Sequence, residues 1–250
     1  MTDVSKVTDV TNAVSGTGGE FEKTESGKEQ FGKTEFGKGK TAGIGEKEWR
    51  AALEEKQGAE LCRLFAGAHV AICGAGGLGS NIAVTLARVG VGHLHIIDFD
   101  KVEITNLNRQ QYFTDQIGMT KVFALEENLK RIAPYCDVRA ECMKISADNI
   151  HGLFDEEPII CEAFDKAEAK AMLAECVMQE YPDRVIVSGS GMAGIGHANE
   201  MKTRRVTEHL YICGDEKSDV DAEECLLGSR VAICAAHQAH TVLRLIAGLC

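Results

Sequence analysis

A glycine-rich segment and an acidic residue downstream of it have the spacing of a nucleotide-binding site. The segment lies between an apolar run that predicts a strand and a longer run with apolar residues at helical spacing; it contains Gly74, Gly76, Gly77, Leu78 and Gly79. Glycines permit a tight turn there, and the bare N–H groups of a helix N-terminus attract phosphate. Asp98 follows about 20 residues later, where a carboxylate can accept hydrogen bonds from ribose hydroxyls. The pattern predicts a bound nucleotide and leaves NAD and ATP both possible.

A dense polar block after Asp98 favours ATP. It contains Asp100, Asn106, Arg109 and Gln110, and Lys121 begins the next predicted helix. An NAD-dependent dehydrogenase needs no such block, because its ribose-binding acid works nearly alone. Arg109 offers a planar fork of donors and Lys121 a point charge, so together they could hold a triphosphate.

The composition limits the classes of partner. The chain has a formal net charge of −11, so it lacks the basic surface expected of a nucleic-acid-binding protein, although a small phosphorylated ligand needs only a few local cations. No apolar stretch reaches the roughly 18 residues that a membrane span needs. Met1–Gly19 has no apolar segment typical of a secretory signal. We therefore expect a cytoplasmic protein that binds neither nucleic acid nor a membrane.

The ten cysteines predict free thiols. None belongs to a Cys-x-x-Cys pair, so a zinc knuckle built from two such pairs is not expected. The cytoplasm keeps thiols reduced. Cys73 and Cys161 fall in apolar runs, where a thiol acts as a small core hydrophobe.

Short apolar runs alternate with longer helical ones over most of the chain. The runs that predict strands are 69–73, 93–97, 136–142, 158–161 and 184–188. Helical spacing covers 49–65, 78–89, 120–132, 166–179 and 231–249, and a short helix is expected near Ile150. This alternation predicts an α/β fold: a Rossmann-like, doubly wound, mostly parallel sheet with helices on both faces. We expect one such domain over 46–250 and a disordered, low-complexity tail over 1–45, which is poor in large apolar residues.

Four motifs together resemble the E1-like adenylyltransferases of the ThiF/MoeB/HesA family. They are Gly74-x-Gly-Gly-Leu-Gly79, Asp98-Phe-Asp100, Asn106-Leu-Asn-Arg-Gln110 and Gly118-x-x-Lys121. The resemblance is closest to the compact, zinc-free ThiF branch, through Glu162-Ala-Phe-Asp-Lys166, Ser190-Gly-Met-Ala-Gly194 and Ala235-Ala-His-Gln238. It implies an enzyme of thiamine biosynthesis that uses ATP and Mg²⁺ to adenylylate a ubiquitin-like sulfur carrier protein, ThiS-like and ending in Gly-Gly.

The resemblance also implies a role for each residue. Asp98 would hold the ribose, Lys121 would stabilise charge at the reacting α-phosphate, and the phosphates would be faced by Asn106, Arg109 and Gln110. Asp165 would help to place Mg²⁺, with capping of the helix that follows as the alternative. The expected catalytic residues are thus Arg109, Lys121 and Asp165. The glycine-rich loop 189–196 would lie under the carrier's tail.

Several alternatives stay open. The resemblance implies a homodimer in which Arg50 or Arg63 of the partner covers the phosphates, and a separate sulfur donor. Cys213 or Cys225 could instead bond covalently to the carrier. Rival functions are activation of a molybdopterin carrier, dehydration of a modified tRNA, NAD-dependent oxidation and non-catalytic binding. The acidic stretch 215–224 is expected to be an exposed, mobile loop.

Overall fold

The computed structural model describes residues 43–219, 222 and 225–250. Ile44–Cys250 form one compact unit, and the boundary expected at residue 46 stays a prediction. The expected disordered tail falls almost wholly on residues outside the described part, so it stays a prediction too. Within the described ranges, no helix combines the length and the apolar character needed to cross a membrane.

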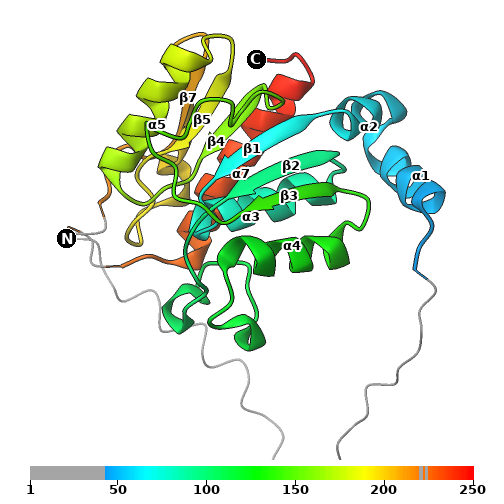
Figure 1. The fold of residues 1–250 in the computed structure, drawn as a ribbon, viewed down its shortest axis with the longest axis horizontal. Helices are drawn as coiled ribbons and strands as arrows, with labels where there is room; N and C mark the ends of the chain where they lie inside the picture. The colour runs from blue at the N-terminus through cyan, green and yellow to red at the C-terminus, as the bar shows by residue number, and fades with distance from the viewer. Residues whose placement is uncertain (1–42, 220–221, 223–224) are drawn as a thin grey trace, which may run out of the picture. The chain divides into compact units, whose positions relative to one another are not determined.

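A mostly parallel, seven-stranded sheet organises the described residues (Figure 1). Its strands are β1 (His69–Cys73), β2 (His93–Ile97), β3 (Asp137–Glu141), β4 (Ile159–Glu162), β5 (Val185–Gly189), β6 (Lys202–Arg205) and β7 (Leu210–Gly214). The spatial order is β3-β2-β1-β4-β5-β7-β6, and in this sheet β6 alone runs antiparallel to its neighbour. The strand order reverses between β1 and β4, which confirms the predicted doubly wound, Rossmann-like fold.

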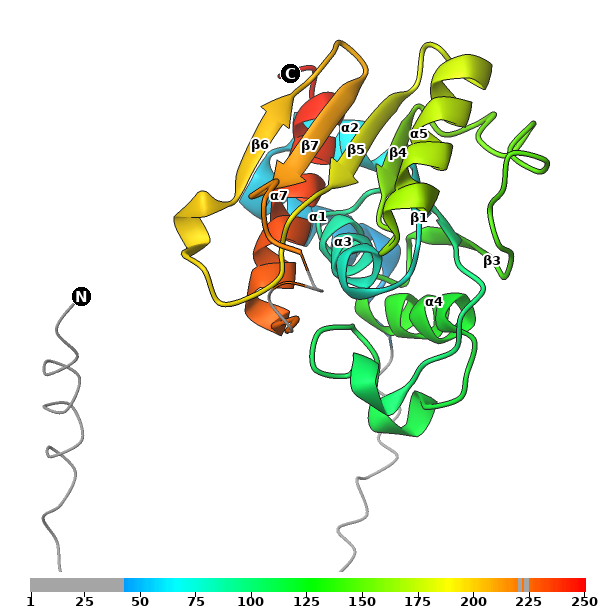
Figure 2. The same ribbon diagram turned by 90° about the vertical axis from the view of Figure 1, so that its left-hand side faces the viewer.

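Helices cover both faces of the sheet (Figure 2). They are α1 (Glu46–Gln57), α2 (Ala59–Ala66), α3 (Gly77–Arg88), α4 (Lys121–Ile132), α5 (Ala167–Glu180) and α7 (Gly228–Ile246). The core beneath α3, α4 and α7 contains Val70 and Ile72 of β1. The core beneath α5 contains Ala71 and Cys73 of the same strand. Alternate residues of β1 therefore enter opposite cores, as the two-residue period of a strand requires.

The prediction of a short helix near Ile150 is wrong. Residues 142–158 form turns and irregular backbone. Ile150 and Phe154 are buried in the core beneath α5, and the Phe154 ring lies edge-on to Tyr181 with centroids 5.9 Å apart. The Tyr181 hydroxyl donates a hydrogen bond to the Ile150 carbonyl at 3.0 Å. Packing against α5 accounts for the apolar residues here, since tertiary contacts override local periodicity.

Two further features escaped the sequence pattern. The helical stretch 49–65 divides at Gly58, whose φ of +85° separates α1 from α2. The hairpin of β6 and β7 was not predicted, because all four residues of β6 are polar or charged and exposed. Such a strand lacks the alternation of apolar and polar residues that identifies strands in a sequence.

Replacing Phe154 by alanine should lower the free energy of unfolding by about 3–5 kcal/mol, because the fully buried ring would leave a cavity. Phe123→Ala is the control: its side chain is 48% exposed, and we expect a change within about 0.5 kcal/mol. Urea unfolding followed by circular dichroism measures both. A loss below about 1 kcal/mol for Phe154→Ala would contradict the placement of this segment in the core.

Candidate active site

The glycine segment joins β1 to α3, and two of its glycines are required by packing. Gly74 has a φ of +104°, and a Cβ atom added there would lie 2.7 Å from the carbonyl oxygen of Ala163. A Cβ atom at Gly79 would lie 1.7 Å from the carbonyl oxygen of Gly74. No larger residue could let α3 approach the loop this closely.

Gly76 differs, because packing within the chain does not require it. It is the N-cap residue of α3, and without a side chain it cannot cap the first N–H groups of the helix. The nearest atom to an added Cβ would be Gln110 Nε2, at 3.8 Å. The first N–H groups of α3 have no partners within the helix, and the helix dipole favours an anion beside them. The free space at Gly76 therefore suits a phosphate group.

A side chain at position 77 would point into the protein, and the side chain of Leu78 does so. An added Cβ at Gly77 would lie 2.9 Å from Val231 Cγ1, and the Leu78 side chain belongs to the core beneath α3. Only their main-chain N–H groups could contact a nucleotide.

Asp98 links the glycine segment to the polar block. Its Oδ2 accepts the N–H of Ala75 at 2.6 Å, and its Oδ1 accepts the N–H of Asp100 at 2.7 Å. The Tyr112 hydroxyl donates to the Ala75 carbonyl at 2.6 Å. Burial, followed by the charges of Asp98 and Asp100, raises the pKa of Tyr112, so the phenol keeps its proton. The expected ribose contact of Asp98 stays a prediction, to which the structure adds a role in anchoring the loop.

Lys121 forms an ion pair with Asp100. Its Nζ donates to Asp100 Oδ2 at 2.9 Å, and the lysine side chain is 8% exposed, against 50% for the aspartate. In the structure the Asp100 carboxylate holds the lysine, and a contact of Asp100 with the nucleotide stays a prediction. Asp98, Asp100 and Lys121 are thus connected by consecutive hydrogen bonds.

Arg109 lies over the start of α3. Its Cγ and Cδ atoms are 3.6 Å from the Cβ position of Gly77, and its Nη1 donates to the Thr105 carbonyl and to Asn108 Oδ1, both at 2.9 Å. These bonds hold the guanidinium on the polar block, while the Cγ and Cδ atoms lie against the glycine segment. The sequence-predicted cation and phosphate loop are therefore neighbours.

Asn106 and Gln110 are buried beside Arg109. Asn106 Oδ1 accepts the N–H of Glu103 at 3.1 Å and closes a turn of the polar block. Gln110 Oε1 is buried without a hydrogen-bond partner among the described residues. An unsatisfied buried acceptor is a reason to expect a water or another hydrogen-bond donor beside it, and the atom of Gln110 that lies nearest to Gly76 is the donor Nε2. Phosphate contacts of both amides stay a prediction.

Asp165 lies in the turn that follows β4. The turn packs on the glycine segment through Ala163, and the Asp165 side chain is exposed. The alternative role as a helix cap is wrong: Lys166 is the N-cap residue of α5, and no side chain caps that helix. The described residues contain no group of three His, Cys, Asp or Glu side chains that could hold a metal by themselves. A single exposed carboxylate nevertheless fits Mg²⁺, which usually keeps waters and substrate phosphate oxygens as its other ligands.

Sequence reasoning missed a buried polar network beside the Asp165 turn. Glu162 ends β4 and pairs with Lys170 of α5, and the Ser188 hydroxyl donates to the same carboxylate. A glutamate at the end of an otherwise apolar strand was the available signal. Its partners come from other elements and could not be identified from spacing.

The expectation of an exposed acidic loop over 215–224 is wrong at Asp215. Its side chain is 7% exposed and accepts a hydrogen bond from Arg230 Nη2. Burial alone would raise the pKa of Asp215, but hydrogen bonds led by that from the Ser218 N–H, together with the charge of Arg230, hold it below its ordinary value. Residues 220–221 and 223–224 lie outside the described part of the chain.

The two candidate cysteine nucleophiles have different surroundings. Cys213 is fully buried, and burial raises the pKa of its thiol although the Thr203 hydroxyl lies 3.5 Å from the sulfur. A buried, protonated thiol is a poor nucleophile. Cys225 is partly exposed, and its carbonyl accepts the N–H of Gly194 in the loop 189–196 at 3.0 Å.

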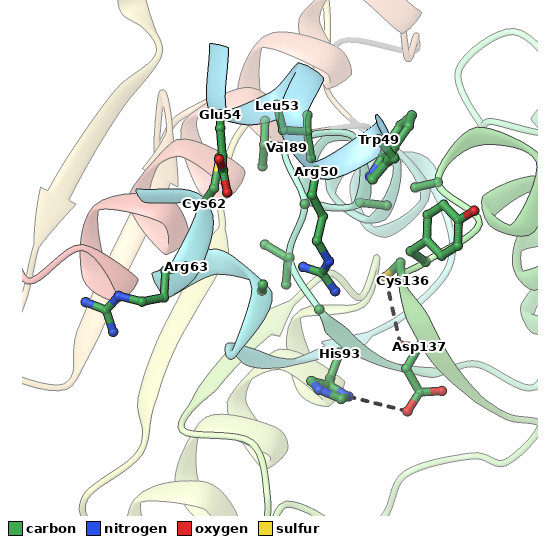
Figure 3. A pocket seen from close by; sticks show the side chains of 17 residues that line it. Trp49, Arg50, Leu53, Glu54, Cys62, Arg63, Val89, His93, Cys136 and Asp137 are labelled. Carbon is green, nitrogen blue, oxygen red and sulfur yellow. Dashed lines mark hydrogen bonds and ion pairs between the residues drawn. The ribbon is translucent and has the colours of Figure 1, made fainter. Parts of the chain in front are cut away.

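The cavity shown in Figure 3 lies away from this site. It has a volume of about 390 Å³ and is lined by α1, α2 and the first residues of β2 and β3, whereas the glycine segment follows the last residue of β1. Arg50 and Arg63 both line it, and Arg50 pairs with Glu46 at 2.7 Å. Neither arginine therefore reaches the glycine segment of its own chain. Their expected role across a dimer stays a prediction.

Gly76→Ala should leave the free energy of unfolding within about 1 kcal/mol of the wild type, because a Cβ there meets no close atom. It should weaken ATP binding by at least about tenfold, because the methyl group would occupy the phosphate position. Gly79→Ala is the contrasting variant and should destabilise the fold by about 3 kcal/mol or more. Equilibrium dialysis with labelled ATP and urea unfolding measure the two effects. Unchanged ATP affinity in Gly76→Ala would move the phosphate site elsewhere.

Known proteins that are similar in sequence to part of this chain include the following three. The chain is 35% identical over 127 residues to the adenylyltransferase and sulfurtransferase MOCS3 of Culex quinquefasciatus. It is 34% identical over 137 residues to the tRNA threonylcarbamoyladenosine dehydratase of Escherichia coli, and 37% identical over 116 residues to the sulfur carrier protein ThiS adenylyltransferase of Bacillus subtilis. The alignments cover 50%, 54% and 45% of this chain, and 28%, 51% and 34% of those proteins. The chain thus matches at most about half the length of these relatives.

A solved structure of the E. coli tRNA N6-threonylcarbamoyladenosine dehydratase in complex with ATP has a similar fold. The TM-score is 0.73 at 20% identity, covering 82% of this chain and 97% of that one. At this identity the likeness concerns the fold alone. A family model for the ThiF family matches residues 51–249. The match includes the glycine segment, the polar block and the Asp165 turn, and the chain belongs to the ThiF family.

Proposed function

We propose that the protein is an ATP-dependent adenylyltransferase that activates the C-terminal glycine carboxylate of a ubiquitin-like sulfur carrier. One observation carries the proposal: Arg109 lies against Gly77, with Cγ and Cδ 3.6 Å from its Cβ position. The hydrogen bonds through Asp98 and Asp100 connect Lys121 to the same glycine segment. Two cations beside a phosphate-binding helix N-terminus suit a triphosphate.

The proposed reaction needs no general base. A carboxylate oxygen of the carrier attacks the α-phosphorus of ATP, and a C(=O)–O–P bond forms. The bond from the α-phosphorus to the bridging oxygen breaks, and pyrophosphate leaves with its electron pair. Because the nucleophile is already an anion, catalysis depends on positioning and on stabilisation of charge.

Arg109 and Lys121 would provide that stabilisation. Among the residues that the structure describes, Asp100 accepts one of the three Nζ hydrogens of Lys121, so the other two would remain for the α-phosphate. The lysine is largely buried, where its charge is screened less than in water. Among the described residues, Arg109 uses only Nη1 for its hydrogen bonds, so Nε and Nη2 remain for phosphate oxygens.

The other predicted residues would bind substrate and metal. Asp98 would accept hydrogen bonds from the ribose, and Asn106 and Gln110 would face the phosphates. Mg²⁺ bound with ATP would neutralise charge on the departing pyrophosphate. Asp165 would hold that ion together with phosphate oxygens and waters.

The proposal extends to the identity of the carrier and to its pathway. The φ angles of Gly191 and Gly194 are +76° and +75°, so loop 189–196 contains two left-handed turns, and an extended Gly-Gly tail would lie along its main chain. The 37% identity to a ThiS adenylyltransferase supports a ThiS-like carrier and thiamine biosynthesis. A homodimer completed by Arg50 or Arg63, a separate sulfur donor and a cytoplasmic location belong to the same proposal.

A dehydratase acting on modified tRNA is the second candidate. The 34% identity to such an enzyme, over about half of each protein, favours it. The net charge of −11 argues against it, because tRNA binding requires a basic approach surface.

Arg109→Ala and Lys121→Met should each reduce carrier-dependent exchange of labelled pyrophosphate into ATP by about 100-fold, because each removes one charge-stabilising donor. Lys101→Met is the control, since Lys101 is an exposed lysine of the same polar block. Thiamine-type and molybdopterin-type carriers are assayed in parallel. Wild-type exchange in both variants would remove these residues from the site. ATP-dependent turnover of modified tRNA, without exchange for any carrier, would favour the dehydratase.

A further inference from the structure

A buried carboxylate at the end of β4 has no part in the proposed reaction. Glu162 is the last residue of β4, and its side chain is 1% exposed. Burial of a charge is costly unless the charge is paired and hydrogen-bonded. The partner is Lys170 of α5, whose Nζ lies 3.0 Å from both carboxylate oxygens.

One side of this pair holds the turn that carries Asp165. Glu162 Oε1 accepts the N–H of Phe164 at 2.7 Å, one residue before Asp165. The same turn packs on the glycine segment, since a Cβ at Gly74 would lie 3.4 Å from Phe164 Cδ1. The course of the turn therefore depends on the orientation of the Glu162 carboxylate.

The other side of the pair holds the start of loop 189–196. The Ser188 hydroxyl donates to Glu162 Oε2 at 2.6 Å. Lys170 Nζ donates to the Gly189 carbonyl at 2.9 Å, at the end of β5. The two charged side chains thus bond to both loops that leave the carboxyl ends of β4 and β5.

We infer that Glu162 and Lys170 form a positioning pair that fixes Asp165 relative to loop 189–196. The inference rests on the proposed function, in which Asp165 holds Mg²⁺ and the loop holds the carrier tail. Gln238 of α7 joins the same two strands, because its Nε2 donates to the main-chain carbonyls of Glu162 in β4 and Val187 in β5, each at 3.0 Å. A hydrogen-bonded network of this kind fixes one geometry, whereas an apolar pair could stabilise the fold without fixing either loop.

The test compares Glu162→Gln, Lys170→Met and the double variant with the wild type. Lys130→Met is the matched control, because it removes an exposed Lys–Glu pair with Glu126 on α4. Three quantities are measured: the urea midpoint, the Mg²⁺ concentration at half-maximal binding of labelled ATP, and carrier-dependent exchange at saturating ATP. The measurement of ATP binding against Mg²⁺ concentration needs no carrier.

Each single variant should have a lower urea midpoint, because a charge loses its buried partner. The double variant should regain most of the wild-type midpoint. It should still need at least about fivefold more Mg²⁺ for half-maximal ATP binding, and its exchange should fall at least about tenfold, because the metal-binding turn and the tail loop are misplaced. Lys130→Met should change none of the three quantities.

A double variant that regains stability, Mg²⁺ requirement and exchange together would show that the pair is only structural. If the double variant fails to fold, Ser188→Ala removes one hydrogen bond to Glu162 without any change of charge. In that variant, an unchanged Mg²⁺ requirement would overturn the inference, and an increase of about threefold would support it. Absence of exchange in the wild type would overturn the proposed function, whereas wild-type ATP binding that does not depend on Mg²⁺ would overturn the inference.

Discussion

The site depends on the carboxylate of Asp98. One oxygen accepts the N–H of Ala75 and the other accepts the N–H of Asp100, at 2.6 and 2.7 Å. Short hydrogen bonds to a carboxylate are among the strong ones. They join the glycine segment after β1 to the polar block after β2, and through Asp100 they fix Lys121. Two segments that leave different strands are thereby held in one arrangement.

The sheet brings the remaining parts to this point. β1 and β4 are neighbours, and the strand order reverses between them; in sheets of this kind ligands bind at the carboxyl ends of the strands beside such a point. The glycine segment leaves β1 and the Asp165 turn leaves β4, so both lie at that end of the sheet. Their close approach at Gly74 and Ala163 excludes any side chain at position 74. The topology of the fold, rather than nearness in the sequence, assembles the site.

Some of this arrangement could be predicted from the sequence, for a physical reason. Strands buried on both faces are continuous apolar runs, and a phosphate loop requires glycines, so β1, α3 and β2 have clear signals. Nucleotide contacts of Asp100 and Asn106 stay predictions, whereas their partners in the structure, Lys121 and the N–H of Glu103, were not predicted. Glu162 and Lys170 are 8 residues apart, and Asp215 and Arg230 are 15 apart. Pairs at such separations follow no helix or strand period, because they depend on how whole elements pack.

A crystal structure of the protein with Mg²⁺ and an ATP analogue that has a methylene bridge between the α- and β-phosphorus would test the central claim most directly. We predict that the triphosphate lies between the N–H groups at the start of α3 and the guanidinium of Arg109, with the ammonium of Lys121 at the α-phosphate. Binding of the analogue in another cavity, or side chains 109 and 121 turned away from its phosphates, would contradict the account.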